Sequence, residues 1–262
     1  MYSDYHVHSH FSFDSDEKPE NIIKQAIKLN MNQICFTDHQ DFNWPVAGEL
    51  PLLNIEEYTS SLCLLKEKYR DNIQILTGIE LGLMNGNETL CNELLNSHNF
   101  DFIIGSCHIV DGMDPYYSTF WRNRNDRDAF ELYFFTLMNA LKSFNRIDSL
   151  GHLDYVVRYS PNRDSNYSVA DYQDILDEIL GFIINKNIKL EINTSNLAKG
   201  FSFPNPHTDI IKRYKELGGE YVTVGSDAHK AEYIGFGFDT VSKIVDKLGL
   251  KVYTKKVKRE IV

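Results

Sequence analysis

Histidines recur at regular places in this sequence, beginning with the stretch DYHVHSH near its start. Six of the nine histidines, and two carboxylates, follow or end short runs of β-branched, aromatic and aliphatic residues. These eight residues are His6, His8, His39, Glu80, His108, His152, Asp227 and His229. Imidazole and carboxylate ligands together suit zinc, manganese or iron(II), whereas calcium and magnesium prefer oxygen ligands alone.

The number of these residues indicates more than one ion. His6 and His8 alternate with other residues of a predicted strand, so both rings point to one side and can reach one ion. Each ion takes about four ligands, and eight convergent ligands therefore indicate two or three ions. Two ions about 3.5–4 Å apart can share a bridging carboxylate or hydroxide. A single buried histidine is more often structural, but six at matching strand ends predict a metal centre.

The other three histidines fall outside this pattern. His10 follows the first strand in a predicted loop, and His98 lies at the end of a predicted helix. His207 stands in NPHTD, a predicted helix start. We expect these three side chains to lie on the surface or beside the ligands, without binding metal.

Strand-like runs alternate with longer amphipathic stretches along the chain. Seven strands are predicted: the run before His6, 32–37, 72–81, 100–108, 146–153, 187–195 and 220–229. Helices are predicted between them, with Pro19 in a first turn. Asn54, with Glu57 three residues later, is typical of a helix start, and Ser168 repeats that signal before another helix.

This alternation predicts an α/β fold with a mainly parallel sheet. Seven strands indicate a closed or nearly closed barrel, and residues 1–262 are expected to form a single domain. An open doubly wound sheet fits less well, because no glycine-rich dinucleotide turn follows the first strand. In a barrel, the C-terminal ends of all strands meet on one face, where such folds carry their active sites.

Composition and charge narrow the classes of ligand. The chain has 262 residues, of which 42% are hydrophobic and 24% charged, and its net charge is −10. Acidic surfaces of this kind argue against nucleic acid as the main ligand. No apolar run approaches the roughly 20 residues that span a bilayer, and the start lacks the features of a signal peptide. We therefore expect no membrane association and a cytoplasmic location.

The cysteines show neither the paired spacing of a zinc site nor a disulfide framework. They are Cys35, Cys63, Cys91 and Cys107, and all are predicted to be reduced thiols of the core. A thiol nucleophile at Cys107 is disfavoured, because adjacent residues of a strand point to opposite faces and His108 would not reach it.

The order of these motifs resembles that of the polymerase and histidinol phosphatase (PHP) superfamily. H-x-H, T-D-H, a lone glutamate, two later histidines at strand ends and D-x-H all stand in order, up to about Gly237. The resemblance implies a distorted (β/α)7 TIM-like barrel with a metal site at the C-terminal ends of the strands. DYHVHSHFSFDS and LEINTSNLAKG, with the later PNP, are most similar to the monofunctional histidinol-phosphate phosphatases of that superfamily.

The resemblance also implies a ligand set for each of three ions. Those implied for the first ion are His6, His8, Glu80 and Asp227. Glu80 would bridge to a second ion, whose other ligands are His108 and His152. The ligands implied for the third ion are Asp14, His39 and His229. Some relatives carry histidine in place of Asp14, so the third site is a carboxylate variant.

The expected reaction is hydrolysis of a small phosphate ester, and the resemblance implies L-histidinol phosphate as the substrate. Bridging zinc, manganese or iron ions would lower the pKa of a bound water and supply hydroxide for in-line attack on phosphorus. The predicted catalytic residues are Glu80, Asp227, His229 and Asp38. The proton donor to the leaving alcohol is left open between a metal-bound water, Asp38 and an outer ligand. Asp38 could instead orient a neighbouring imidazole.

Basic residues are expected to complete the phosphate site. Arg158, just beyond the strand that carries His152, can bind phosphate oxygens bidentately, although it could also be a solvated loop charge. Ser195 and Lys199, after the strand ending in EIN, are further candidates. The aromatic stretch 109–125 is either a lid over the site or a packed surface excursion.

Three other functions remain as alternatives. Another PHP phosphoesterase would act on a different small phosphate ester, a nucleotide, a nucleic acid or phosphotyrosine. A non-enzymatic scaffold would lack part of the ligand set, which is complete in this sequence. An amidohydrolase-type barrel would add a bridging lysine at a strand end, and no lysine stands at the matching position. The sequence does not predict the oligomeric state.

Overall fold

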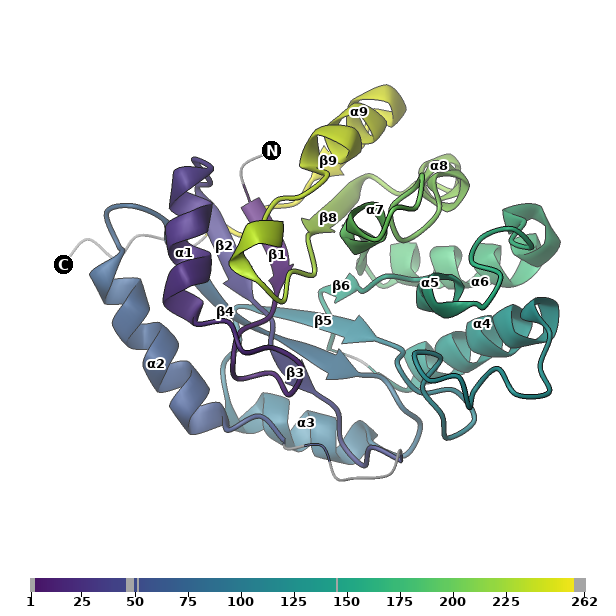
Figure 1. Cartoon of the computed structure of the whole chain (residues 1–262), viewed down its shortest axis with the longest axis horizontal. Helices are drawn as coiled ribbons and strands as arrows, with labels where there is room; N and C mark the ends of the chain where they lie inside the picture. The colour runs from purple at the N-terminus through teal and green to yellow at the C-terminus, as the bar shows by residue number, and fades with distance from the viewer. Residues whose placement is uncertain (1–2, 46–49, 51, 145, 257–262) are drawn as a thin grey trace.

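A curled sheet of parallel strands forms the centre of the molecule (Figure 1). The structure is a computed structural model and describes residues 3–45, 50, 52–144 and 146–256. Its strands are β1 (Ser3–Val7), β2 (Gln33–Phe36), β3 (His39–Gln40), β4 (Gln74–Gly82), β5 (Phe102–Ser106), β6 (Ser149–Leu150), β7 (Lys189–Asn193), β8 (Tyr221–Gly225) and β9 (Lys251–Val252). All seven predicted strands are present, and β3 and β9 are short additions.

Most of the helices lie around the outer side of this sheet, and two short ones directly follow the C-terminal ends of β6 and β7 (Figure 1). They are α1 (Pro19–Lys28), α2 (Ile55–Lys68), α3 (Glu88–Ser97), α4 (Asp126–Ser143), α5 (Tyr155–Tyr159), α6 (Gln173–Asn185), α7 (Ser195–Ala198), α8 (Thr208–Glu216) and α9 (Phe238–Leu248). Two short 3₁₀ helices, η1 (Val169–Tyr172) and η2 (Ala231–Tyr233), precede α6 and α9. The main hydrophobic core fills the layer between the helices and the sheet.

The strands follow one another in the sheet in sequence order, β1-β2-β4-β5-β6-β7-β8-β9, with β3 beside β4. Every strand pair is parallel. The sheet curls far enough for Val7 of β1 to form a parallel bridge with Ala228, just after β8. This sequential order confirms the predicted TIM-like parallel fold and differs from a doubly wound sheet, whose strand order reverses at one point.

Two of the predicted helix starts are confirmed. Helix α1 begins at Pro19, where the missing N–H costs no intrahelical hydrogen bond. Asn54 caps α2, because its side chain accepts a hydrogen bond from the backbone N–H of Glu57 at 3.3 Å.

The start predicted at Ser168 is wrong for the α-helix. The Ser168 side chain makes no capping hydrogen bond, and the chain first forms the tighter 3₁₀ helix η1. Helix α6 begins only at Gln173. Tyr172, the last residue of η1, is buried beside the ring of Phe134, so core packing of this side chain accompanies the delayed start.

A smaller cluster fills the sheet interior near the N-terminal ends of the strands, away from the predicted site. It contains Tyr5, Cys35, Leu76, Phe102 and Ile104, with Tyr253 packed against it. All four cysteines are free, as expected. Three are buried, but Cys63 is exposed, because it lies on the outward side of α2 and not in the core.

No helix in the described part of the chain is long and apolar enough to cross a membrane. The expected cytoplasmic location and the single-domain assignment stay predictions.

Candidate metal centre

The C-terminal ends of the strands bring all the predicted ligands to one place. His6 lies in β1, His39 begins β3 and Glu80 lies in β4. The other predicted ligands stand just beyond strands: His8 after β1, His108 after β5, His152 after β6, and Asp227 and His229 after β8. Asp14 comes from the loop that follows β1. Parallel strand ends thus gather side chains from both ends of the sequence, as the barrel prediction requires.

Glu80 lies at the centre of what we call the inner group, which comprises His6, His8, Glu80, His108 and His152. Glu80 Oε2 is 3.1 Å from His6 Nε2 and 3.4 Å from His8 Nε2. Glu80 Oε1 is 3.1 Å from His152 Nε2 and 3.4 Å from His108 Nε2. The two oxygens of one carboxylate therefore face two different pairs of imidazoles, the arrangement that a bridging carboxylate needs.

Asp227 borders the inner group next to the first pair of imidazoles. Its Oδ1 is 3.4 Å from His8 Nε2 and 3.8 Å from His6 Nε2. The structure thus brings together the four side chains predicted to bind the first ion, which are His6, His8, Glu80 and Asp227.

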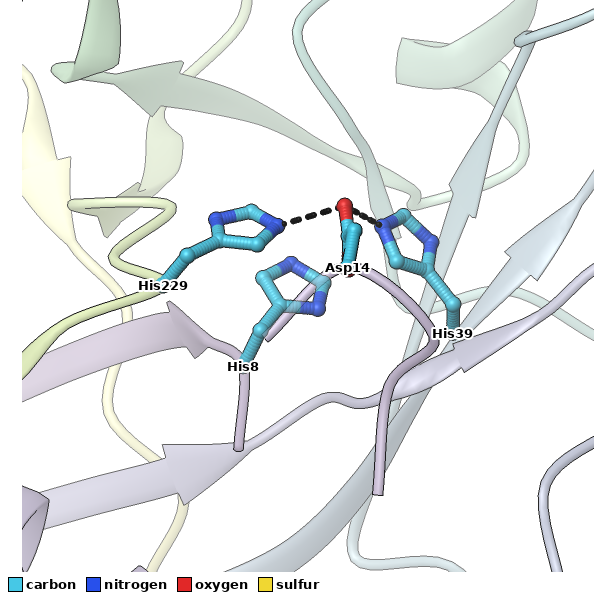
Figure 2. A group of neighbouring side chains, drawn as sticks. All are labelled: His8, Asp14, His39 and His229. Carbon is cyan, nitrogen blue, oxygen red and sulfur yellow. Dashed lines mark hydrogen bonds and ion pairs between the residues drawn. The ribbon is translucent and has the colours of Figure 1, made fainter. Parts of the chain in front are cut away.

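The outer group comprises Asp14, His39 and His229, with the ring of His8 beneath it (Figure 2). Asp14 Oδ2 is 2.9 Å from His229 Nε2 and 3.6 Å from His39 Nε2. The His8 ring stacks against both histidines, with centroid distances of 4.4 Å to His39 and 4.3 Å to His229. His39 also touches the inner group, because its Nδ1 is 3.1 Å from Glu80 Oε2.

Four buried polar atoms at this place fit a cation. Within the described residues, no hydrogen-bond partner is present for His6 Nε2, His8 Nε2, His39 Nδ1 or Glu80 Oε2. Buried polar atoms are almost always paired, so four such atoms facing one another need an explanation. Each can offer a lone pair, and a nitrogen and oxygen donor set of this kind suits zinc and related divalent ions.

Carboxylates behind the imidazoles hold two rings in orientation. His6 Nδ1 lies 2.6 Å from Glu191 Oε1, and His108 Nδ1 lies 2.9 Å from Asp41 Oδ1. A hydrogen bond at Nδ1 leaves the Nε2 lone pair directed at the centre, and such partners raise the basicity of a ligand. Glu80 is itself held, because Ser106 Oγ donates to its Oε1 at 2.6 Å. The sequence reasoning missed Asp41, Ser106 and Glu191.

The carboxylate of Asp38 reaches the imidazole of His8 through a serine. Its Oδ1 accepts hydrogen bonds from Ser12 Oγ at 2.9 Å and from the backbone N–H of Ser9 at 2.7 Å. Ser12 Oγ in turn lies 3.1 Å from His8 Nδ1. Asp38 is fully buried and does not line the cavity described below, so this geometry favours the orienting role over proton donation to a leaving group.

Burial and charge shift the pKa values of His6 and His8, at the end of the first strand, in opposite directions. Burial, assisted by the nearby rings of His229 and His39, lowers the pKa of His8 to about 3. This imidazole is therefore neutral and keeps a lone pair. Burial also acts to lower the pKa of His6, but Glu191 and the other surrounding carboxylates outweigh it and raise that pKa well above the usual value. The same negative charge would attract a divalent cation.

A cavity of about 630 Å³ opens above the centre. Its wall includes the predicted ligands Asp14, His39, Glu80, His108, His152, Asp227 and His229. Aromatic side chains form much of the remainder: Phe13, Trp44, Tyr116, Tyr117, Tyr155, Tyr159 and Tyr233. A largely aromatic wall over a polar floor is typical of a small-molecule site.

All three predicted substrate-binding residues line this cavity. Arg158 lies in α5 and is buried, so the alternative of a solvated loop charge is wrong. Its Nη1 donates to Asp227 Oδ2 at 3.1 Å, and Ser195 Oγ donates to the same oxygen at 3.2 Å. The ammonium group of Lys199 lies 5.3 Å from the centre of the Tyr159 ring.

Most donors of Arg158 are already used within the protein. Its Nη2 donates to Asn205 Oδ1 at 2.8 Å and to Asn193 Oδ1 at 3.2 Å. Its Nε donates to Asn196 Oδ1 at 3.1 Å. The guanidinium is thus fixed between α7, the end of β7 and Asp227.

The C-terminal part of stretch 109–125 packs against the protein. Phe120 and Trp121 are buried, and Arg124 bonds the backbone oxygen of Phe120 at 2.7 Å. Its tip supplies Tyr116 and Tyr117 to the cavity wall, so the excursion shapes the site whether or not it moves as a lid.

The three histidines excluded from the ligand set lie where expected. His10 is exposed in the loop after β1, and His98 caps the C-terminus of α3. His207 caps α8, where its side chain accepts a hydrogen bond from the backbone N–H of Asp209. None of the three belongs to a candidate metal group among the described residues.

Comparison with known proteins gives full-length matches. The chain is 36% identical over 251 residues to a probable histidinol-phosphatase of Clostridium acetobutylicum, covering 96% of this chain and 95% of that protein. It is 34% identical over 252 residues to a histidinol-phosphatase of Lactococcus lactis subsp. lactis, covering 94% and 91%. These matches extend past β8 and therefore include the end of the sequence that carries Asp227 and His229.

The fold and a family model agree with these relatives. The crystal structure of the Lactococcus lactis histidinol phosphate phosphatase, complexed with zinc, L-histidinol and phosphate, matches this structure with a TM-score of 0.88. The match has 33% sequence identity and covers 96% of this chain and 95% of that one. A PHP domain model matches residues 4–195, which include seven of the nine predicted ligands. The chain belongs to the PHP domain family.

Proposed function

We propose that this chain is a metal-dependent phosphomonoesterase that hydrolyses L-histidinol phosphate to L-histidinol and phosphate. The observation that carries the proposal is the full-length similarity, in sequence and fold, to a phosphatase whose crystal structure contains zinc, L-histidinol and phosphate. The unpaired buried donors around Glu80 support the same chemistry. The described residues belong to one sheet with its helices, which supports a single domain over residues 1–262.

Two or three divalent ions, with zinc as the first choice, would be held by the inner and outer groups. His6, His8, Glu80 and Asp227 would hold one ion, and Glu80 would share a second with His108 and His152. The outer group would hold a third. Bound ions of this kind activate water as a nucleophile and neutralise the charge of phosphate oxygens.

The residues of the chain then orient the substrate and the ligands. Asp227 is held by Arg158 and Ser195, so its other oxygen stays directed at His8 and His6. Arg158 and Lys199 place positive charge on the wall beside the metal centre, where the phosphate group of a substrate would lie. Of the proposed catalytic residues, His229 has the most exposed side chain, and its Nε2 lies 2.9 Å from Asp14 Oδ2.

A phosphate-release assay tests this function. Purified protein loaded separately with zinc, manganese or iron(II) should release phosphate from L-histidinol phosphate faster than from p-nitrophenyl phosphate, a nucleotide or phosphotyrosine at equal concentration. Chelator should abolish the activity, and added metal should restore it. Turnover of L-histidinol phosphate no better than that of p-nitrophenyl phosphate would contradict the substrate, and full activity in chelator would contradict the metal dependence.

A further inference from the structure

Asp114, in the excursion 109–125, is a buried carboxylate of the cavity wall that lies outside the predicted site. Asp114 is only 6% exposed to solvent. Its Oδ1 accepts hydrogen bonds from the backbone N–H of Tyr116 at 2.8 Å and from the hydroxyl of Tyr155 at 3.2 Å. Within the described residues, no hydrogen bond is made to Oδ2, and no lysine, arginine or histidine lies within ion-pair distance of the carboxylate.

The other carboxylates of the cavity wall differ in this respect. Asp14 and Glu80 each face histidines of the metal centre, and Asp227 faces Arg158 as well as His8. Each of these carboxylates therefore lies beside a positively charged side chain or beside histidines that would bind a metal cation. An ionised carboxylate buried without such a partner is costly, so a binding cavity that contains one is suited to a ligand that brings a cation. Burial accordingly raises the pKa of Asp114, and its hydrogen bonds act in the opposite direction.

The chain around Asp114 is held on both sides. The preceding residue, Met113, pairs with Val110 in an antiparallel bridge, with N···O distances of 2.8 and 3.0 Å. The following residue, Pro115, accepts a hydrogen bond through its backbone oxygen from Trp121 Nε1 at 2.8 Å. This carboxylate is therefore presented to the cavity in a fixed place, which is what a specificity contact requires.

Tyr155 separates Asp114 from the metal centre. The Tyr155 ring lies 5.4 Å from the His108 ring and 5.0 Å from the His152 ring, between centroids. Its hydroxyl bonds Asp114, while the Arg158 guanidinium lies 5.6 Å from the ring centre. The cavity therefore has a part suited to phosphate, made by the metal centre and Arg158. The carboxylate of Asp114 lies on the other side of the Tyr155 ring from that part.

We propose that Asp114 binds the primary ammonium group of the substrate and makes the enzyme selective for phosphorylated amino alcohols. The inference rests on the proposed function and names a contact for the part of the substrate that the metal centre does not recognise. The Tyr155 hydroxyl and the Tyr116 N–H hold Oδ1, which leaves Oδ2 to accept the ammonium hydrogen bond. The phosphate and the ammonium of one small molecule are then held at two separate places.

The test compares Asp114→Asn with the unchanged protein on three phosphate esters. These are L-histidinol phosphate, 3-(imidazol-4-yl)propyl phosphate, which lacks only the ammonium group, and 2-aminopropyl phosphate, which lacks only the imidazole. In the unchanged protein, kcat/KM should be higher for L-histidinol phosphate than for the ester without ammonium. Asp114→Asn should reduce that ratio about 10- to 100-fold, the worth of a hydrogen bond between charged groups.

Asp111→Asn is the matched control. Asp111 belongs to the same excursion, but its side chain is exposed and pairs with Arg124 instead of lining the cavity. This variant should keep the ratio of the unchanged protein. Thermal unfolding of both variants shows whether each is folded.

The outcomes separate this inference from the proposed function. If the unchanged protein prefers L-histidinol phosphate but Asp114→Asn leaves the ammonium ratio within about twofold, the assignment of Asp114 is overturned and the function stands. The assignment is also overturned if Asp114→Asn mainly reduces discrimination against the ester without imidazole. If the unchanged protein does not prefer L-histidinol phosphate at all, the proposed function fails and the inference fails with it.

Discussion

The inner and outer groups of the metal centre differ in how they are supported. The Glu80 side chain is fully buried, and its oxygens face four histidine nitrogens of the inner group. In the outer group, the Asp14 side chain is 36% exposed and that of His229 is 31% exposed. Glu191 and Asp41 lie behind His6 and His108 at 2.6 and 2.9 Å, and Asp41 also lies 3.4 Å from His39 of the outer group. His229 Nδ1 has a weaker support, because it lies 3.0 Å from the backbone oxygen of Asp227 and 3.8 Å from its Oδ1.

From this difference we infer that the ions of one centre can be bound with different affinities. Ligands fixed by packing and by hydrogen bonds lose little freedom on binding metal, whereas exposed ligands must be ordered by the ion itself. We therefore expect the inner group to hold its ions tightly and the outer group to exchange its ion with solvent. Three changes test this contrast and a fourth tests the cavity wall beside the two groups, in order of decreasing expected effect.

Removal of the carboxylate charge of Glu80 should have the largest effect. Glu80→Gln takes the shared ligand from two ion sites, so kcat should fall at least about 10³-fold, or roughly 4 kcal/mol of transition-state stabilisation. Metal analysis should show less than half the metal content of the unchanged protein. Glu178→Gln, at an exposed residue paired with Lys142, is the matched control. Full metal content in Glu80→Gln would contradict the central place of this carboxylate.

Removal of a support behind the inner group should have the next effect. Glu191→Gln keeps the shape of the side chain but weakens its hold on His6 Nδ1, so zinc affinity should fall about 10- to 100-fold. Competition with a chelator of known affinity measures the change. An unchanged affinity would show that packing alone orients the His6 ring.

A change in the outer group should leave the inner ions in place. Asp14→Asn should lower the metal content by one equivalent and reduce kcat roughly tenfold, about 1.4 kcal/mol. Asp14→His supplies another ligand at the same position and should restore most of both. Loss of more than one equivalent in Asp14→Asn would show that the two groups bind metal as one unit.

The smallest expected effect is a pH dependence at Lys199. Partial burial, and then the charge of Arg158, lower the pKa of Lys199 to about 8. The lysine is charged below this pH and loses its charge as the pH rises through it, so KM should increase a few-fold above about pH 8. Lys199→Arg keeps its charge and should remove this increase, whereas Lys212→Arg, on the exposed side of α8, should not. The same increase in both variants would assign the effect to another group.

The convergence of the candidate ligands was predictable because their residue types and their places in the sequence both carry information. Histidine is rare, and six histidines at strand ends converge in any parallel barrel without knowledge of the loops. Glu191 and Asp41 were missed because carboxylates are common and these two repeat no spacing. A signal did exist for Glu191, which stands between Leu190 and Ile192 in the buried strand β7, where an unpaired charge would be costly.

Asp114 and the start of α6 depended on tertiary structure. The position of Asp114 follows from a bridge between Val110 and Met113 in an irregular excursion, which no periodic pattern marks. At Ser168, the local signal for a helix start was present, but the chain continued through the 3₁₀ helix η1 before α6. Local preferences of this size are weak and are often overridden by packing.

The bridge between Val7 and Ala228 joins the two ends of the chain beside the centre, which has a consequence for protein synthesis. Asp14 and His229 lie 215 positions apart, so a nascent chain on the ribosome carries His6 and His8 long before their partners emerge. Two histidines alone bind an ion weakly and exchange it. We therefore expect the apolar layer between helices and sheet to drive most of the folding, and tight metal binding to follow once both ends of the chain have come together.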